Sequence, residues 1–120
     1  MPKLRYTPKA LEDLQGIKAY IVKQFGIDTA KKIMSEIALA ARQLEKFPEE
    51  GPSLEEVIDY PTDYRYLVVR PNYIFYRCEP NTVSIIRILN EKQDFLQILF
   101  GISSVSEEGE DYWSSLETEW

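Results

Sequence analysis

The stretch from Asp63 to Phe100 constrains the fold most, because it predicts three short strands joined by two turns. Both turns carry the same pair, Pro71-Asn72 and Pro80-Asn81. Proline presets φ at the first inner position of a type I or II turn, and asparagine tolerates the left-handed conformation after it. A two-residue type I′ hairpin needs positive φ where proline stands, so we expect loops of three to five residues in an antiparallel meander.

The same stretch holds four of the six arginines. Arg65 and Arg87 lie inside otherwise apolar strands, whereas Arg70 and Arg77 flank turns. Guanidinium groups bind carboxylate and phosphate oxygens with fixed geometry. We therefore expect Arg65 and Arg87 to form one electropositive site for a phosphate-bearing or carboxylate-bearing partner. Salt bridges within the sheet are the alternative for each arginine.

The N-terminal half predicts a strand followed by a helix hairpin. We expect the strand over residues 3–6, with Thr7 as N-cap of the first helix and Pro8 at its first position. Asp28 is expected to cap a second helix that Pro48 ends. Apolar residues recur at helical spacing in both helices, namely Ala10, Leu14, Ile17 and Ile21, then Ala30, Ile33, Met34, Ile37, Ala41 and Leu44.

The remaining segments complete an α+β domain over residues 1–102. Residues 49–62 predict a loop with a short turn at 54–58, and residues 94–100 predict a short C-terminal helix. In the strand over residues 82–89 both side-chain parities are largely apolar, so the sheet needs cover on both faces. The helix hairpin covers one face. Candidates for the other are the C-terminal tail, a second copy, a partner protein or the domain's own loops.

The net charge of −6 is concentrated in the C-terminal tail, residues 103–120. Residues 1–106 hold 14 basic and 14 acidic side chains, so the six surplus acids all fall within residues 107–120. A neutral body argues against broad nonspecific nucleic-acid binding. We expect the tail to dock on the arginine-bearing sheet of its own domain, with disorder as the alternative. The expected apolar anchors are Tyr112, Trp113, Leu116 and Trp120.

Several kinds of chemistry are excluded because the chain has no histidine and a single cysteine, Cys78. The missing histidine removes the commonest general base, most zinc and iron sites, and every Ser-His or Cys-His nucleophile. Cys78 cannot form an internal disulfide, and we expect a small buried residue on a strand. No apolar run reaches the roughly 18 residues that span a bilayer, and the N-terminus lacks a signal-peptide pattern. We expect a cytoplasmic protein without metal or cofactor.

Residues 3–100 together resemble the RelE/ParE superfamily of toxins from type II toxin–antitoxin modules, and the N-terminal half is more similar to the ParE side. The resemblance implies a cognate antitoxin as partner, with operator DNA contacted only through that antitoxin. It rests on the order and spacing of Tyr6-Thr7-Pro8, Ala10-Leu11-Glu12-Asp13-Leu14, Tyr20-Ile21, Phe25-Gly26, Ala30, Leu44 through Pro48 to Gly51, and the runs 64–69, 73–77 and 83–94.

The resemblance implies alternative activities. ParE-type toxins bind DNA gyrase and trap its cleavage complex without a catalytic set, and this is the function that we expect. RelE-type toxins instead cleave mRNA on the ribosome, where Arg65 and Arg87 match phosphate-stabilising arginines. In that alternative Asn90 replaces a histidine that many relatives carry, and Phe95, which lacks a hydroxyl, falls near the late catalytic aromatic. Lys92, Asp94 or a tyrosine is then the substitute proton carrier. A degenerate, non-toxic antitoxin-binding module is the third possibility.

The resemblance and the arginine pattern together give one set of expected contacts to a target or antitoxin. These residues are Arg65, Arg70, Arg77, Arg87, Asn90, Asp94 and Phe95.

Overall fold

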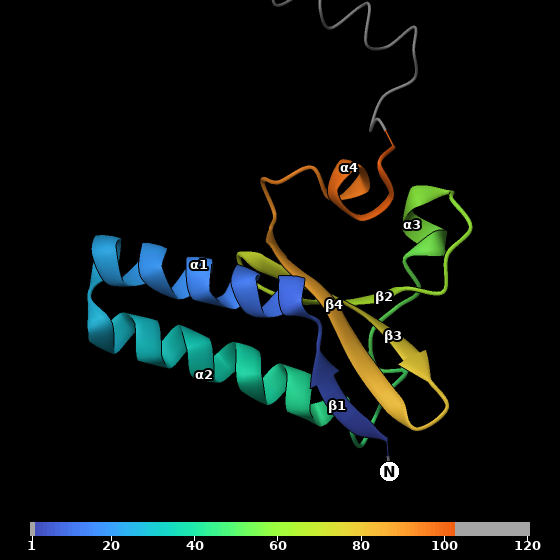
Figure 1. The fold of residues 1–120 in the computed structure, drawn as a ribbon, viewed down its shortest axis with the longest axis horizontal. Coiled ribbons are helices and arrows are strands. Elements are labelled where there is room, and N and C mark those ends of the chain that lie inside the picture. The colour runs from blue at the N-terminus through green and yellow to red at the C-terminus, as the bar shows by residue number, and fades with distance from the viewer. Residues whose placement is uncertain (1, 103–120) are drawn as a thin grey trace, which may run out of the picture.

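Helices cover both faces of a four-stranded sheet in the computed structural model, which describes residues 2–102 (Figure 1). Helices α1 and α2 pack on one face, and α3 and α4 pack on the other. The expected α+β fold is confirmed. The elements in chain order are β1 (Lys3–Tyr6), α1 (Pro8–Phe25), α2 (Ile27–Gln43), α3 (Glu55–Ile58), β2 (Arg65–Val69), β3 (Asn72–Glu79), β4 (Thr82–Asn90) and α4 (Phe95–Phe100).

The sheet has the order β1-β4-β3-β2, so the N-terminal strand joins the meander at its β4 edge. Strand β1 runs parallel to β4, from the pair Lys3↔Thr82 to the pair Tyr6↔Ile85. The sheet is therefore mixed and four-stranded, whereas the sequence predicted a purely antiparallel meander of three. Beyond Ile85 the outer edge of β4 has no strand partner among the described residues.

The first hairpin loop is shorter than predicted. Val69 pairs directly with Asn72, so Arg70 and Pro71 alone form the loop. This register places Arg70 at the second and Pro71 at the third position of the turn, and the peptide bond between them is cis. The expectation of three to five residues assumed proline at the second position and was wrong here.

The second hairpin loop also contains two residues, Pro80 and Asn81, because Glu79 pairs with Thr82. Positive φ among the described non-glycine residues occurs at Asp59 alone, so this loop is not of type I′ and Asn81 does not adopt the left-handed conformation. Excluding type I′ was correct. Inferring a longer loop from that exclusion was wrong.

Helix α1 begins as predicted, and α2 does not. The Thr7 side chain accepts a hydrogen bond from the Ala10 amide, which caps α1. Gly26, with φ of +95°, ends α1 and is also the N-cap residue of α2. The predicted cap Asp28 therefore lies inside the first turn of α2, where its charge complements the positive helix end. The helix ends at Gln43, several residues before Pro48.

The face of the sheet toward α1 and α2 forms the larger core. Most predicted apolar positions of both helices lie in this core or at its border, and Ile21 and Ala30 are buried outside it. The sheet contributes residues of β3 and β4 that project to this face. The fully buried members of this core are Ala10, Ile37, Ala41, Leu44, Ile74, Tyr76, Val83, Ile85 and Ile88.

The opposite face of the sheet is covered by the chain itself. Leu54, Phe75 and Leu89 are buried there beneath α3, α4 and a group of half-buried aromatic residues. Phe95 at the start of α4 stacks on Phe75, with the two ring centroids 5.3 Å apart. Of the candidates that the sequence left open, the domain's own segments supply this cover.

Candidate functional site

Arg87 ties helix α1 to the edge of the sheet. Its Nε and Nη2 atoms donate to the two carboxylate oxygens of Asp13 at 2.7 and 2.8 Å. The Asp13 carboxylate also accepts the Ile88 amide at 2.9 Å, and the Thr7 hydroxyl donates to the Ile86 carbonyl at 2.8 Å. The start of α1 thus supplies hydrogen-bond partners for backbone groups of β4 that have no partner on β1.

The Arg87–Asp13 pair is well shielded, because the two side chains are 23% and 12% exposed. The hydrogen bond from Arg87 to Asp13 raises the pKa of Arg87 above its ordinary value, and partial burial opposes this shift. Bidentate arginine–carboxylate pairs are among the strongest polar contacts in proteins. Arg87 is therefore engaged inside the domain, as the salt-bridge alternative proposed.

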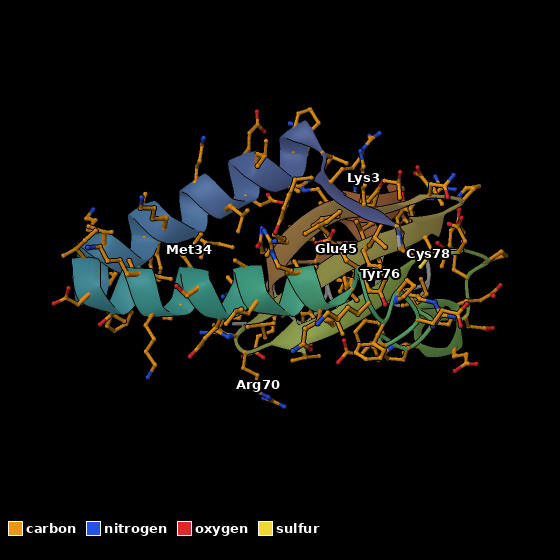
Figure 2. All side chains as sticks on the ribbon, turned by 90° about the horizontal axis from the view of Figure 1, so that it is seen from below. Lys3, Met34, Glu45, Arg70, Tyr76 and Cys78 are labelled. Carbon is orange, nitrogen blue, oxygen red and sulfur yellow. The ribbon has the colours of Figure 1, made fainter. Side chains whose placement is uncertain are left out.

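Arg65 fastens the loop that follows α2. Its Nη1 atom donates to the Gly51 carbonyl at 2.7 Å and lies 3.5 Å from the Glu49 carbonyl. On the same loop, the Gly51 amide donates to the Tyr76 hydroxyl at 2.9 Å. Burial raises the pKa of Tyr76, whose side chain is fully buried in the core with Ala41 and Leu44 and lies near the end of α2 in Figure 2. Arg65 and Tyr76 therefore hold residues 49–51 against the sheet.

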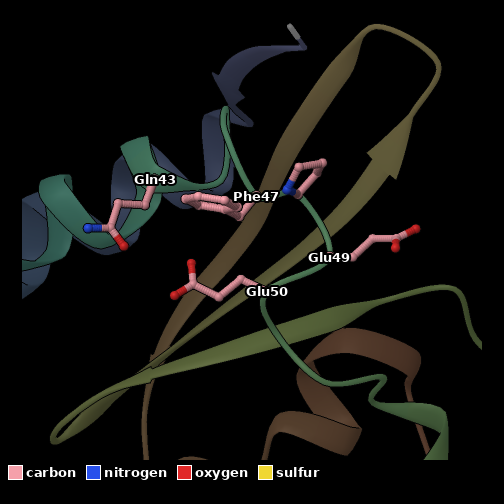
Figure 3. Close-up of a pocket in the computed structure, with 5 residues that line it drawn as sticks. Gln43, Phe47, Glu49 and Glu50 are labelled. Carbon is pink, nitrogen blue, oxygen red and sulfur yellow. The ribbon is translucent and has the colours of Figure 1, made fainter.

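A shallow cavity of about 540 Å³ lies on the outer side of this loop (Figure 3). Phe47, which is 62% exposed, projects beside Gln43, and the Glu49 and Glu50 side chains diverge from the same loop. The lining is aromatic and acidic, and it repels phosphate. This cavity is not the anion site that the arginines suggested.

Cys78 is exposed, so the expected burial was wrong. Its thiol contacts the Pro48 carbonyl at 3.2 Å. Desolvation by its neighbours raises the pKa of Cys78, which favours the unreactive thiol.

Arg65 and Arg87 lie on opposite faces of the sheet. Residues opposite each other on neighbouring strands project to the same face, and successive residues alternate. Arg65 is opposite Tyr76, which belongs to the core beneath α1 and α2, whereas Arg87 is opposite Phe75, which belongs to the core beneath α4. The structure does not bring these two arginines into one electropositive site.

Arg77 also has an internal partner. Its Nη2 atom donates to Asp63 at 2.8 Å in a solvent-exposed pair, which raises the pKa of Arg77. The Arg77 Nε atom is buried without a hydrogen-bond partner among the described residues. Exposed pairs of this kind contribute about 0–1 kcal/mol to stability.

One group of predicted residues does come together, at the end of the sheet where β2 meets β3 and β4 ends. Asn72 pairs with Asn90, and the Glu91 amide donates to the Pro71 carbonyl at 2.8 Å. This contact places the Arg70 turn beside the Asn90–Lys92 turn. We call the surface formed by Arg70, Asn90 and Lys92 the basic turn site.

The basic turn site is rigid at its backbone and open at its cationic side chains. The Asn90 side chain accepts the Lys92 amide at 2.9 Å, and the Asn90 amide donates to the Gln93 side chain at 2.8 Å. Arg70 and Lys92 are both exposed, and Arg70 projects from the molecule in Figure 2. Two exposed cations on adjacent, hydrogen-bonded turns suit an acidic partner surface.

Asp94 and Phe95 serve α4 instead. The Asp94 side chain accepts the Gln97 amide at 3.2 Å and caps the helix, while Phe95 belongs to the core beneath it. Both residues have a structural role next to the basic turn site.

The three residues of the nuclease alternative do not converge. Arg65 and Arg87 are on opposite faces, and Lys92 is exposed beyond the end of β4. A lysine that acts as a base is normally desolvated. Within residues 2–102, no group of acidic and cysteine side chains is arranged to hold a metal ion, and no helix is both long and apolar enough to cross a membrane.

Sequence reasoning missed three residues that hold the predicted arginines or the loop beside them: Asp13, Gly51 and Tyr76. Asp13 follows Ala10 by three residues and so flanks the buried face of α1, while Arg87 lies in an apolar strand. The sequence therefore offered one signal for the Asp13–Arg87 pair, because both charged residues border apolar segments. Nothing local marked Gly51 as a hydrogen-bond partner of Tyr76. The predicted tail anchors Tyr112, Trp113, Leu116 and Trp120 lie outside the described residues.

Comparison with known proteins identifies the family. The family model for the ParE toxin of the type II toxin–antitoxin system parDE matches residues 4–95. The structure is similar to the chromosomal ParDE TA system from P. aeruginosa, with a TM-score of 0.64 and 25% identity over 75% of this chain and 96% of that chain. The chain belongs to the ParE toxin family, within the RelE/ParE superfamily.

A more distant likeness extends to the fold alone. The YoeB-YefM complex from Staphylococcus aureus gives a TM-score of 0.50 and 15% identity over 73% of this chain and 94% of that chain. No curated protein matches the sequence significantly.

Proposed function

We propose that this chain inhibits growth in the cytoplasm by binding DNA gyrase and that a cognate antitoxin neutralises it. The observation that carries the proposal is the ParE family match across residues 4–95. The similar ParDE structure is of a toxin–antitoxin system, which supports an antitoxin as partner. In this proposal operator DNA is contacted through the antitoxin.

The arrangement of the arginines supports binding over mRNA cleavage. A nuclease that stabilises the transferring phosphate needs its cations around one phosphate position. Here Asp13 engages Arg87 and the carbonyl of Gly51 engages Arg65, on two faces of the sheet. The basic turn site is instead exposed, and it is the surface that we assign to the target.

Inducible expression without antitoxin tests this proposal. We expect growth arrest with DNA-damage induction and filamentation, while bulk mRNA stays intact. The double change Arg70→Glu and Lys92→Glu should weaken the arrest strongly, because charge-assisted contacts contribute about 1.5–3 kcal/mol each. Lys3→Glu with Arg5→Glu, a double change of the same total charge on the exposed side of β1, is the matched control and should leave the arrest intact.

Two outcomes would contradict the proposal. Rapid codon-positioned mRNA cleavage with undamaged DNA would promote the ribosome-dependent nuclease. Normal growth at high expression, together with antitoxin binding, would show a non-toxic antitoxin-binding module.

A further inference from the structure

Helix α1 exposes a line of residues that no other described element covers. Leu11, Val22 and Phe25 are 48%, 37% and 65% exposed. Gln15 and Lys18 lie between Leu11 and Val22 on the same side of the helix. The five residues are spaced four, three, four and three positions apart, which is the spacing of one helix face. We call these five residues the α1 stripe.

The far ends of α1 and α2 project past the sheet (Figure 1). Ile27, at the start of α2, is 49% exposed and extends the apolar surface around the helix connection. Val22, Phe25 and Ile27 thus gather exposed apolar side chains around the helix connection, and such patches can mark a docking site. The alternating three and four spacing of the α1 stripe is the spacing at which one helix packs along another.

The described part of the chain ends just after α4, on the side of that helix that faces α3 (Figure 1). Ile98 and Leu99 of α4 line a cavity of about 480 Å³ together with Thr7, Pro8 and Lys9. One side of α4 is therefore next to the first turn of α1, whereas Phe100 at the end of α4 stacks on Tyr64 near α3. The 18 residues of α1 extend about 27 Å from its first turn at 1.5 Å per residue. The seven residues from 103 to 109 cover about 23 Å when extended. A helix of residues 110–120 that begins beside the first turn of α1 then extends about 16 Å along the stripe.

The tail and the stripe are complementary in charge and spacing. Residues 107–120 hold six acidic side chains and no basic one, whereas residues 15–25 of α1 hold Lys18 and Lys23 and no acid. Trp113, Leu116 and Trp120 follow one another at three and four residues, the spacing of the stripe. Lys18 stands among the apolar residues of the stripe, where an aromatic ring can contact its ammonium group.

We propose that residues 110–120 dock as a helix along the α1 stripe of their own chain. The arginine-bearing sheet, on which the sequence analysis expected the tail to dock, is a less suitable docking surface. Its arginines Arg65, Arg77 and Arg87 have internal partners, and α3 and α4 already cover the apolar part of the second face. The tail is also additional to the family match, which ends at residue 95. The segment proposed to dock therefore lies outside the residues that the family model matches.

Tryptophan fluorescence measures this docking directly, because both tryptophans of the chain, Trp113 and Trp120, lie in the tail. Acrylamide quenching of the full chain should be several-fold weaker than quenching of a synthetic peptide of residues 103–120. The double change Val22→Gln and Phe25→Gln should raise quenching to the level of the peptide. Both positions are exposed, so the fold should be retained, and circular dichroism checks this.

A matched control separates the stripe from apolar surface in general. Leu39→Gln and Phe47→Gln remove apolar side chains that are 64% and 62% exposed elsewhere on the domain, and they should leave the protection unchanged. Three results would overturn the proposal. Quenching equal to that of the peptide would show no docking, and protection that survives the stripe changes would place the tail elsewhere. Protection that disappears on dilution would assign the stripe to the tail of a second copy.

Discussion

Changing Asp13 to asparagine should destabilise the domain by about 2–4 kcal/mol. Breaking a fully buried ion pair costs about 3–5 kcal/mol, and the 12% and 23% exposure of Asp13 and Arg87 places this pair somewhat lower. The change removes the charge that Arg87 faces. It also replaces one of the two acceptor oxygens by an NH2 group, which then faces either Arg87 Nη2 or the N–H groups of Arg87 Nε and Ile88. Denaturant unfolding should show a lower midpoint with an unchanged slope.

Glu12→Gln is the control for this prediction. Glu12 is the adjacent acid, 67% exposed, and it forms a surface pair with Lys9 at 3.4 Å. Its neutralisation should change stability by no more than about 0.5 kcal/mol. Equal midpoints for the Asp13 and Glu12 variants would contradict the structural role of the Arg87 pair. Arg87→Gln should likewise destabilise the domain. A loss of toxicity in that variant is therefore first explained by lower stability and not by a lost contact to a partner.

Gly51→Ala should cost about 2–4 kcal/mol for a different reason. A β-carbon at this position would overlap the Tyr66 carbonyl oxygen and come within 2.8 Å of the Tyr76 hydroxyl. The loop must then move, which combines about 1–3 kcal/mol of overpacking with the loss of the bond from the Gly51 amide to Tyr76. Thermal unfolding of the variant should occur well below that of the parent chain.

Gly16→Ala should instead increase the stability of the domain. Gly16 lies in the middle of α1, and a β-carbon added there would meet no described atom within 4 Å, so alanine fits freely. Alanine is favoured over glycine inside a helix by about 1 kcal/mol. If both alanine variants unfold at the same temperature, the close approach of the loop to Tyr76 is not what stabilises residues 49–51.

Local chemistry explains what the sequence predicted correctly. Thr7 followed by Pro8 specifies a helix start through one hydrogen bond and one fixed φ, and the apolar spacing of α1 and α2 identifies the faces that are buried. Gly26 ends α1 because it adopts positive φ. These features depend on residues within a few positions of each other, which is why the helices and their core faces could be predicted.

Pairings across the chain could not be predicted in the same way. Asp13 and Arg87 are 74 residues apart, and their contact depends on α1 lying along the edge of β4 that β1 leaves open. The hairpin loops depend on register, which the neighbouring strands and the bulge between Phe75 and Tyr76 determine together. The candidate site in the structure therefore differs from the predicted one. The sequence shows where the arginines are but not which carboxylates and carbonyls of the same domain bind them.

Gyrase-mediated DNA cleavage by the purified chain is the most direct test of the proposed function. The full chain would be incubated with DNA gyrase, ATP and negatively supercoiled plasmid, and protein would then be denatured and digested. We predict linear plasmid in amounts that rise with toxin concentration and fall in the variant Arg70→Glu with Lys92→Glu. Plasmid that stays supercoiled at excess toxin, while the same preparation cuts mRNA on translating ribosomes, would contradict the gyrase account.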